Sequence, residues 1–98
     1  MIWQVSHTSK ADRDIWSAAT WYENQKQRLS QEFLDEILAV EDNLSLHPLI
    51  YPILHKDVRR VAAKRFPHAV YFVIREHKVI IIAVLHVHRN PDIWKKRT

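Results

Sequence analysis

The sequence contains no cysteine and no glycine among its 98 residues. The absence of cysteine excludes a disulfide framework and thiolate chemistry, and it is compatible with a reducing cytoplasm, where we expect the protein to act. The absence of glycine excludes the glycine-rich loops that cradle nucleoside triphosphates. It also removes the tight two-residue hairpin turns of the Asn-Gly kind, so we expect hairpin loops of three to five residues.

Long hydrophobic segments are also absent. The longest apolar run is far shorter than the roughly 20 residues that span a bilayer, so we expect no membrane segment. No signal peptide is visible, because the first residues enter a strand-like pattern without a basic segment before an apolar one. No serine or cysteine stands in a nucleophile-elbow motif.

The residues that are present describe a small basic globular chain. With 47% hydrophobic and 27% charged residues, the composition predicts one folded domain over residues 1–98 with a single core. The net charge is +4 and the pI about 9.6, which favours an anionic partner such as nucleic acid, an acidic protein or a membrane surface. A basic domain without such a partner is the simpler alternative.

The most apolar stretch, KVIIIAVLHVHR at residues 78–89, predicts a long central strand. Because side chains alternate along a strand, the odd-numbered residues from 79 to 87 share one apolar face. The other face carries, in order, Ile80, Ile82, Val84, His86 and His88. A strand that is apolar on both sides is expected to lie between two covering layers.

The rest of the chain shows helical and strand periodicities in turn. They predict a strand over residues 2–5, a helix over 10–26 capped by Thr8 or Ser9, a helix from the cap Ser30 to residue 46, a loop over 47–57, strands over 58–66 and 68–75, and a short tail over 93–97. Trp16 and Trp21 flank the apolar stripe of the first helix and are expected in the core, and Trp94 is expected to dock the tail.

The predicted order is β-α-α-β-β-β, an α+β fold in which the N-terminal strand and a helical hairpin pack on a mainly antiparallel sheet. We place the helices on the odd-numbered face of the last strand, which stays apolar to its end. No predicted element is left to cover Ile80, Ile82 and Val84 on the other face. An uncovered apolar patch on a small protein marks a binding surface.

The residues that could take part in catalysis or binding cluster in a basic segment and at the end of the last strand. These residues are Arg59, Arg60, Lys64, Arg65, His86, His88 and Arg89. One interpretation is metal-free RNA cleavage, with His86 or His88 as acid or base and Arg60 or Arg65 on the phosphate. A metal site on His86 and His88 needs a third ligand, and no carboxylate is obviously near. In the third interpretation the histidines are ordinary hydrogen-bonded residues and the arginines pair with an acidic partner.

Four segments, taken in order, resemble the RelE/ParE superfamily of type II toxin–antitoxin toxins. The segments are ADRDIWSAATWYENQ, SQEFLDEILAVEDNL followed by HP, VRRVAAKRFPHAVYFVI, and IIIAVLHVHRNPDIWKKR. The run from Arg59 through Tyr71 to Pro91 looks most like the ParE-like branch. The resemblance implies a small cytoplasmic, growth-inhibiting toxin of the plasmid-stabilisation type. It also implies an acidic antitoxin that binds this chain, for which the patch of Ile80, Ile82 and Val84 is the expected surface.

The resemblance leaves the cellular target open between two branches. ParE-like toxins are associated with poisoning of DNA gyrase, and RelE-like toxins with mRNA cleavage on the ribosome. Arg60, Lys64, Arg65 and His86 lie where RelE-like enzymes have catalytic groups, but the tail lacks the tyrosine that such enzymes often place there. We therefore favour a non-enzymatic gyrase inhibitor without metal or cofactor. Its target would face Arg59, Arg60, Lys64, Arg65 and Arg89. An endoribonuclease using Arg60, Arg65, His86 and His88, or a non-toxic binding module, are the alternatives. A homodimer or a toxin–antitoxin hetero-oligomer fits this family.

Overall fold

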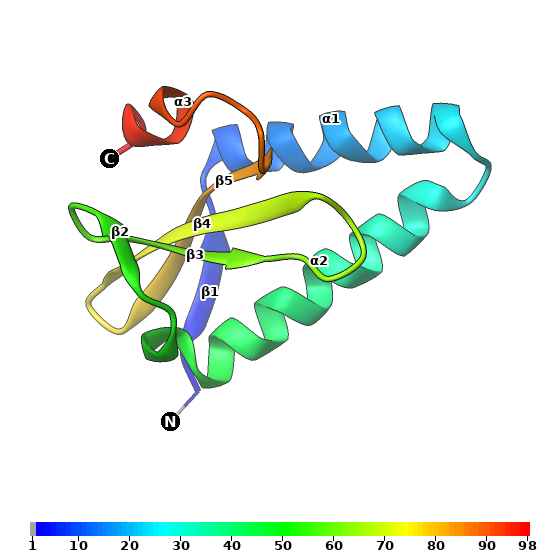
Figure 1. Ribbon diagram of the computed structural model, residues 1–98. Coiled ribbons are helices and arrows are strands. Elements are labelled where there is room, and N and C mark those ends of the chain that lie inside the picture. The colour runs from blue at the N-terminus through cyan, green and yellow to red at the C-terminus, as the bar shows by residue number, and fades with distance from the viewer. Residues whose placement is uncertain (1) are drawn as a thin grey trace.

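The computed structural model describes residues 2–98 and confirms the predicted α+β fold (Figure 1). The elements are β1 (Gln4–His7), α1 (Ser9–Gln25), α2 (Leu29–Leu46), the 3-10 turn η1 (Pro48–Ile50), β2 (Ile53–His55), β3 (Val58–Ala62), β4 (His68–Arg75), β5 (Lys78–His86) and α3 (Asp92–Lys95). No helix within the described residues has the length and apolarity needed to cross a membrane.

The two long helices begin, end and face the sheet largely as their sequences predict. Thr8 is the N-cap of α1, since its hydroxyl accepts a hydrogen bond of 3.1 Å from the backbone N–H of Ala11. The second helix ends at Leu46, ahead of Pro48. Both apolar stripes are buried: Ala11, Ile15, Ala19 and Tyr22 on α1, and Phe33, Ile37, Val40 and Leu44 on α2.

The link between the helices differs from the prediction. Ser30 is not the N-cap of α2, because the helix begins at Leu29 and its N-cap is Arg28, in the left-handed region at φ 74°. The carboxylate of Glu23 accepts hydrogen bonds from the backbone N–H of Arg28 at 3.0 Å and from the hydroxyl of Ser30 at 2.6 Å. A side chain of α1 therefore supplies the cap that the start of α2 lacks.

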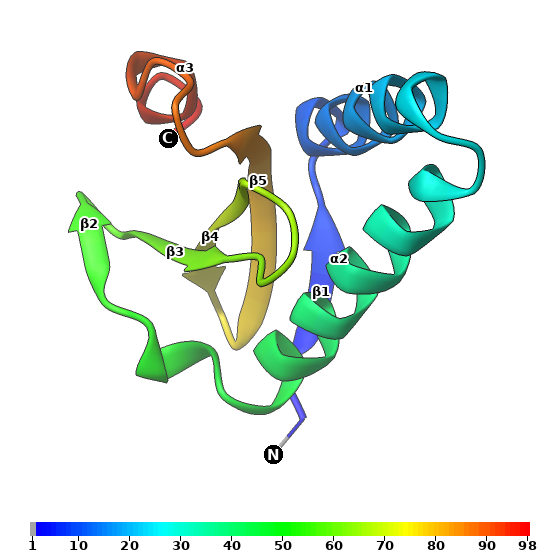
Figure 2. The same ribbon diagram turned by 45° about the vertical axis from the view of Figure 1, so that its right-hand side comes forward.

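The five strands form one sheet in the order β1-β5-β4-β3-β2. β1 runs parallel to β5, and the other neighbours are antiparallel. Figure 2 shows α1 and α2 together on one side of this sheet and the short helix α3 on the other. The two central strands β4 and β5 are thus sandwiched between elements of the same chain.

An extra residue in β5 changes which side chains face the helices. Tyr71 opposes Ala83 and Phe72 opposes Ile81, so Ile82 is a β-bulge without an opposing residue. Before the bulge, Val79 and Ile81 pack in the core under the helices, as predicted. After it the alternation is reversed: Val84 joins the helix-side core, whereas Ala83 and Leu85 face the other way. The predicted faces are therefore wrong for residues beyond Ile82.

The sheet face expected to be uncovered holds a second core. The ring of Trp94 from α3 stacks on Tyr71 with ring centroids 4.7 Å apart and planes at 19°, which confirms the predicted docking of the tail. Ile82 is only 4% exposed in this cluster, and Val84 is 1% exposed on the helix side. The expected open patch of Ile80, Ile82 and Val84 is therefore wrong as a set, and only Ile80 remains half-buried on the α3 side.

The expected loop over residues 47–57 contains a short strand. β2 pairs with the start of β3 at the edge of the sheet, with an irregular register between Ile53 and His55. The interruption by Pro48 and Pro52 conceals this strand in the sequence, because only three residues follow the second proline before the next turn. The imidazole of His55, the last residue of β2, lies edge-on to Trp94 with ring centroids 6.1 Å apart and extends the second core.

The β4–β5 hairpin uses a two-residue turn although the chain has no glycine, contrary to the prediction. β4 ends at Arg75 and β5 begins at Lys78. Glu76 and His77 between them have φ values of 49° and 66°. Two positive φ values in succession are typical of the type I′ turn, whose twist matches that of the strands. Since side chains with a Cβ fit this region poorly, the turn stores conformational strain.

Relieving this strain should stabilise the protein. Replacing His77 by glycine should raise the free energy of unfolding by about 0.5–1 kcal/mol, since glycine adopts positive φ without steric cost. Urea unfolding followed by circular dichroism measures the change. Lys78→Gly, one residue later inside β5, is the matched control and should destabilise the protein. A loss of stability in His77→Gly would show that the His77 ring, 5.9 Å from Trp3, contributes more than the backbone strain costs.

Candidate functional site

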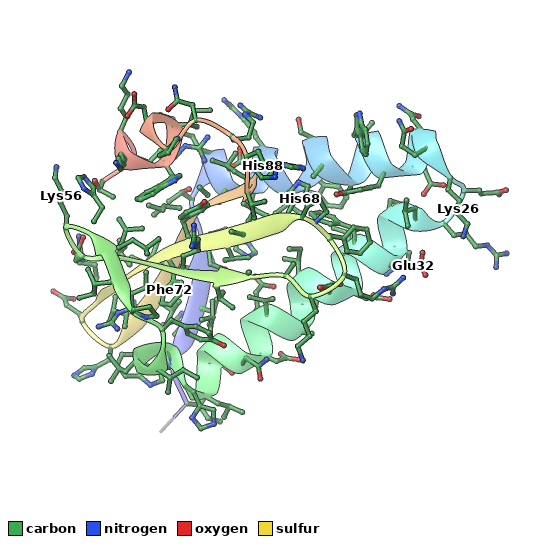
Figure 3. All side chains as sticks on the ribbon, viewed as in Figure 1. Lys26, Glu32, Lys56, His68, Phe72 and His88 are labelled. Atoms are coloured by element: carbon green, nitrogen blue, oxygen red, sulfur yellow. The ribbon has the colours of Figure 1, made fainter. Side chains whose placement is uncertain are left out.

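A cavity of about 470 Å³ opens between α1 and the last residues of β5. Its polar lining consists of Asp14, Ser17, Tyr22, His68, His86 and Arg89, and Trp21 adds an aromatic wall. Figure 3 shows His68 and His88 at this end of the molecule, beside α1. The cavity combines imidazole, phenol, carboxylate and guanidinium groups, so it is the candidate functional site of this chain.

His68 is the buried polar residue of this cavity. It is 8% exposed, and its Nδ1 lies 3.2 Å from the hydroxyl of Tyr22 in a hydrogen bond. Burial, with a further contribution from His86, lowers the pKa of His68 to about 4. Burial also raises the pKa of Tyr22. Both groups are therefore neutral at neutral pH.

The second ring nitrogen of His68 is available to a ligand. The ring lines the cavity, and within residues 2–98 no hydrogen bond joins Nε2 to another group. None of the described side chains leaves a fully buried polar atom unsatisfied, so this nitrogen is open to the cavity. When the Tyr22 hydroxyl donates to Nδ1, Nε2 carries the proton and is a neutral hydrogen-bond donor.

An ion pair with the C-terminal tail holds Asp14, one of the residues that line the cavity. The guanidinium of Arg97 lies 2.5 Å from the carboxylate of Asp14, and both side chains are largely buried. Asp14 also accepts a hydrogen bond from the backbone N–H of Val84 at 3.0 Å, and Arg97 donates to the carbonyl of Ile82 at 3.0 Å. The charge of Asp14 is therefore balanced by partners of its own chain.

The basic residues predicted to form a site are dispersed. Arg59 is bound to the chain itself, with its guanidinium donating to the carbonyl of Tyr51 at 2.6 Å. Arg65 pairs with Glu32 of α2 at 3.3 Å. Arg60 is exposed and opposes Tyr71 in the register of β3 and β4, which puts it on the α3 side of the sheet. Of the five residues expected to face a target, only Arg89 lines the cavity.

The four candidate ribonuclease residues do not converge either. His86 and His88 are neighbours, with ring centroids 5.3 Å apart. Arg65 follows the β3 strand toward the same end of the sheet, but its side chain is directed to α2 and does not line the cavity. The third ligand that a metal site on His86 and His88 needs is not found among residues 2–98.

Four polar residues of the cavity, Asp14, Ser17, Tyr22 and His68, were not identified from the sequence. Tyr22 and His68 fall inside apolar periodicities, where a polar group gives no separate signal, and Asp14 reads as a first-turn acid suited to the helix dipole. Trp16 and Trp21 were expected in the core, and this prediction is wrong, because their side chains are 62% and 59% exposed. Both tryptophans lie beside the buried stripe of α1, and a hydrophobic period alone does not show where the covering layer ends.

Comparison with known proteins defines the class of this fold. A solved structure described as the chromosomal ParDE TA system from P. aeruginosa matches with a TM-score of 0.78, covering 87% of this chain and 96% of that one at 16% identity. Among curated proteins no sequence matches this chain significantly. The two chains therefore share the same fold.

The family follows from the sequence model for the ParE toxin of the type II toxin–antitoxin system, parDE, which matches residues 5–91. The chain belongs to this ParE toxin family, as the resemblance in its segments predicted. It is the toxin component of a type II toxin–antitoxin system, and an antitoxin is its implied partner.

The buried His68 should make the stability of this toxin depend on pH. Its pKa is about 4 in the folded protein, against about 6.5 when unfolded. The unfolded chain therefore binds the extra proton first, and the stabilising contribution of neutral His68 is lost as the pH falls from about 6.5 to about 4. The loss amounts to about 3 kcal/mol of unfolding free energy.

Urea unfolding at several pH values tests this, with His68→Gln as reference because glutamine keeps a hydrogen-bonding group beside Tyr22 without titrating. The free energy of unfolding of the natural sequence minus that of His68→Gln should decrease, or change sign, as the pH is lowered from 7 to 4. An unchanged difference across that range would show that His68 stays protonated or exposed.

Proposed function

We propose that this toxin, when free of its antitoxin, inhibits DNA gyrase in the cytoplasm. The observation that carries the proposal is membership of the ParE toxin family over residues 5–91. The dispersal of Arg60, Arg65, His86 and His88 supports it further, since cleavage of RNA needs its acid, base and cation around one phosphate. A gyrase inhibitor instead needs a binding surface.

We assign part of that surface to the segment running from β3 into the following loop. Arg60 and Lys64 are exposed, and within residues 2–98 their side chains form no ion pair. Arg59 and Arg65 are less suited, because each already binds a group of this chain. Unpaired basic groups attract the acidic surfaces and the DNA of a gyrase–DNA complex.

The purified toxin should block ATP-dependent supercoiling of relaxed plasmid by gyrase and should accumulate cleaved DNA held by the enzyme. The double variant Arg60→Gln/Lys64→Gln should inhibit roughly tenfold less at low ionic strength, since long-range attraction is lost. Lys10→Gln/Lys26→Gln removes the same charge from α1 and its C-cap residue and should inhibit as the natural sequence does.

Two results would overturn the proposal. Unaffected gyrase together with new cuts in translated mRNA that disappear in His86→Ala would establish the ribonuclease alternative. Normal growth when the chain is produced without its partner would establish a non-toxic binding module.

We further propose that an acidic, partly apolar antitoxin segment binds the α3 side of the sheet, forming a toxin–antitoxin hetero-oligomer. Ile80 is half-buried there, next to the second core. Ile82 is reached only if the four-residue helix α3 moves aside, because Trp94 belongs to the same buried cluster. Val84 faces α1 and α2 and is no part of this surface.

Ile80→Lys should weaken the toxin–antitoxin complex by about a hundredfold or more, because it buries an unpaired charge in the interface. Calorimetric titration with the antitoxin measures the affinity. Leu38→Lys, at a position of α2 that is 57% exposed, is the matched control and should bind unchanged. Equal affinities of the two variants would exclude Ile80 from the interface.

A further inference from the structure

Trp21 presents an indole to the cavity beside α1 that the fold itself does not need. The side chain is 59% exposed and lines the opening. Its ring meets Tyr22 edge-on, with centroids 5.1 Å apart and planes at 83°. An aromatic ring that is held in place and still open to solvent is a platform on which a planar group stacks.

The lining of the same cavity also contains donors for an anion, Arg89 and His86. Arg89 is exposed, and its backbone N–H donates to the carbonyl of His86 at 2.9 Å, which closes the turn after β5. Within residues 2–98 the Arg89 side chain forms no ion pair. A free guanidinium fork beside an imidazole matches the oxygens of a phosphate.

The floor and the remaining charge are compatible with such a ligand. His68, which is more than nine-tenths buried, lines the cavity, and among residues 2–98 its Nε2 has no hydrogen-bond partner. Asp14 is the acid of the lining, but its carboxylate is bound by Arg97 and by the N–H of Val84. The volume of about 470 Å³ lies within the roughly 300–1,000 Å³ typical of small-ligand pockets, more than a lone phosphate requires.

We propose that this cavity binds a nucleotide, with the base stacked on Trp21, the phosphate held by Arg89 and His86, and a base or sugar oxygen at His68 Nε2. A free nucleoside monophosphate and an unpaired nucleotide of a single strand share this chemistry. The site lies on different residues from the proposed gyrase surface of Arg60 and Lys64, so either proposal can fail without the other.

The test is a titration of the purified full-length chain with AMP, GMP, CMP and UMP, followed by calorimetry and by quenching of tryptophan fluorescence. At least one monophosphate should bind, and the corresponding nucleoside and inorganic phosphate should each bind about tenfold or more weakly, because each lacks one of the two contacts. A 5′-phosphorylated single-stranded oligonucleotide forms the second arm. Tighter binding than the monophosphate identifies a strand as the source, and equal binding identifies the free nucleotide.

Variants at exposed positions locate the ligand without disturbing the fold. Trp21→Ala and Arg89→Gln should each weaken binding about tenfold, and Trp21→Ala should also abolish the quenching. Trp16→Ala is the matched control, since Trp16 is equally exposed on α1 but lies outside this cavity. Lys96→Gln controls for the loss of one positive charge.

The absence of binding by all four monophosphates and by the oligonucleotide would overturn the proposal. Binding that is unaffected by both Trp21→Ala and Arg89→Gln, or that is weakened equally by Trp16→Ala, would do the same. Protection of Trp21 and Arg89 by the antitoxin alone, with no nucleotide binding, would reassign the cavity to a peptide.

Discussion

The contact between Asp14 and Arg97 replaces a missing strand. β1 pairs with β5 only as far as Ile81, so beyond that point this edge of β5 has no neighbouring strand within residues 2–98. Asp14 accepts the N–H of Val84 there, and Arg97 donates to the carbonyl of Ile82. Two side chains thereby satisfy backbone groups that a strand would otherwise pair, and their opposite charges neutralise each other in a largely buried position. The same contact joins α1, the central strand and the tail, and its Asp14 lines the cavity.

The tail in turn makes a two-sided core possible in a chain of this size. Trp94 covers Tyr71 on the face that α1 and α2 do not reach, so both faces of β4 and β5 are buried by one chain. An antitoxin that uses this face must compete with α3, a helix of four residues. Its Trp94 contacts Tyr71 and His55, and Arg97 just beyond the helix pairs with Asp14. The free energy that such an antitoxin gains from apolar contact with this face is thus reduced by the free energy lost when the tail is displaced.

Sequence periodicity was sufficient for the fold and insufficient for the site. The stripes of Phe33, Ile37 and their neighbours fix which faces of the helices are buried, and Trp94 marks the docking of the tail. The bulge at Ile82 has no signal in a continuous apolar run, because any residue of that run could be the extra one. That single residue reverses the positions of Val84 and His86, and with them the expected binding surface. Of the polar residues that line the cavity, only His86 and Arg89 were candidates, since the others become their neighbours through tertiary packing alone.

The bulge also decides how this chain is to be aligned with its relatives. In a ParE-like strand that runs without the extra residue, the positions after Ile81 would project with opposite parity. A sequence alignment made without a gap would pair Val84, which lies beneath the helices, with a residue of such a strand that lies beneath the tail. Positions of this chain and of such a strand would correspond at this end of the molecule only after a gap of one residue, and substitution patterns read without that gap would mix two environments.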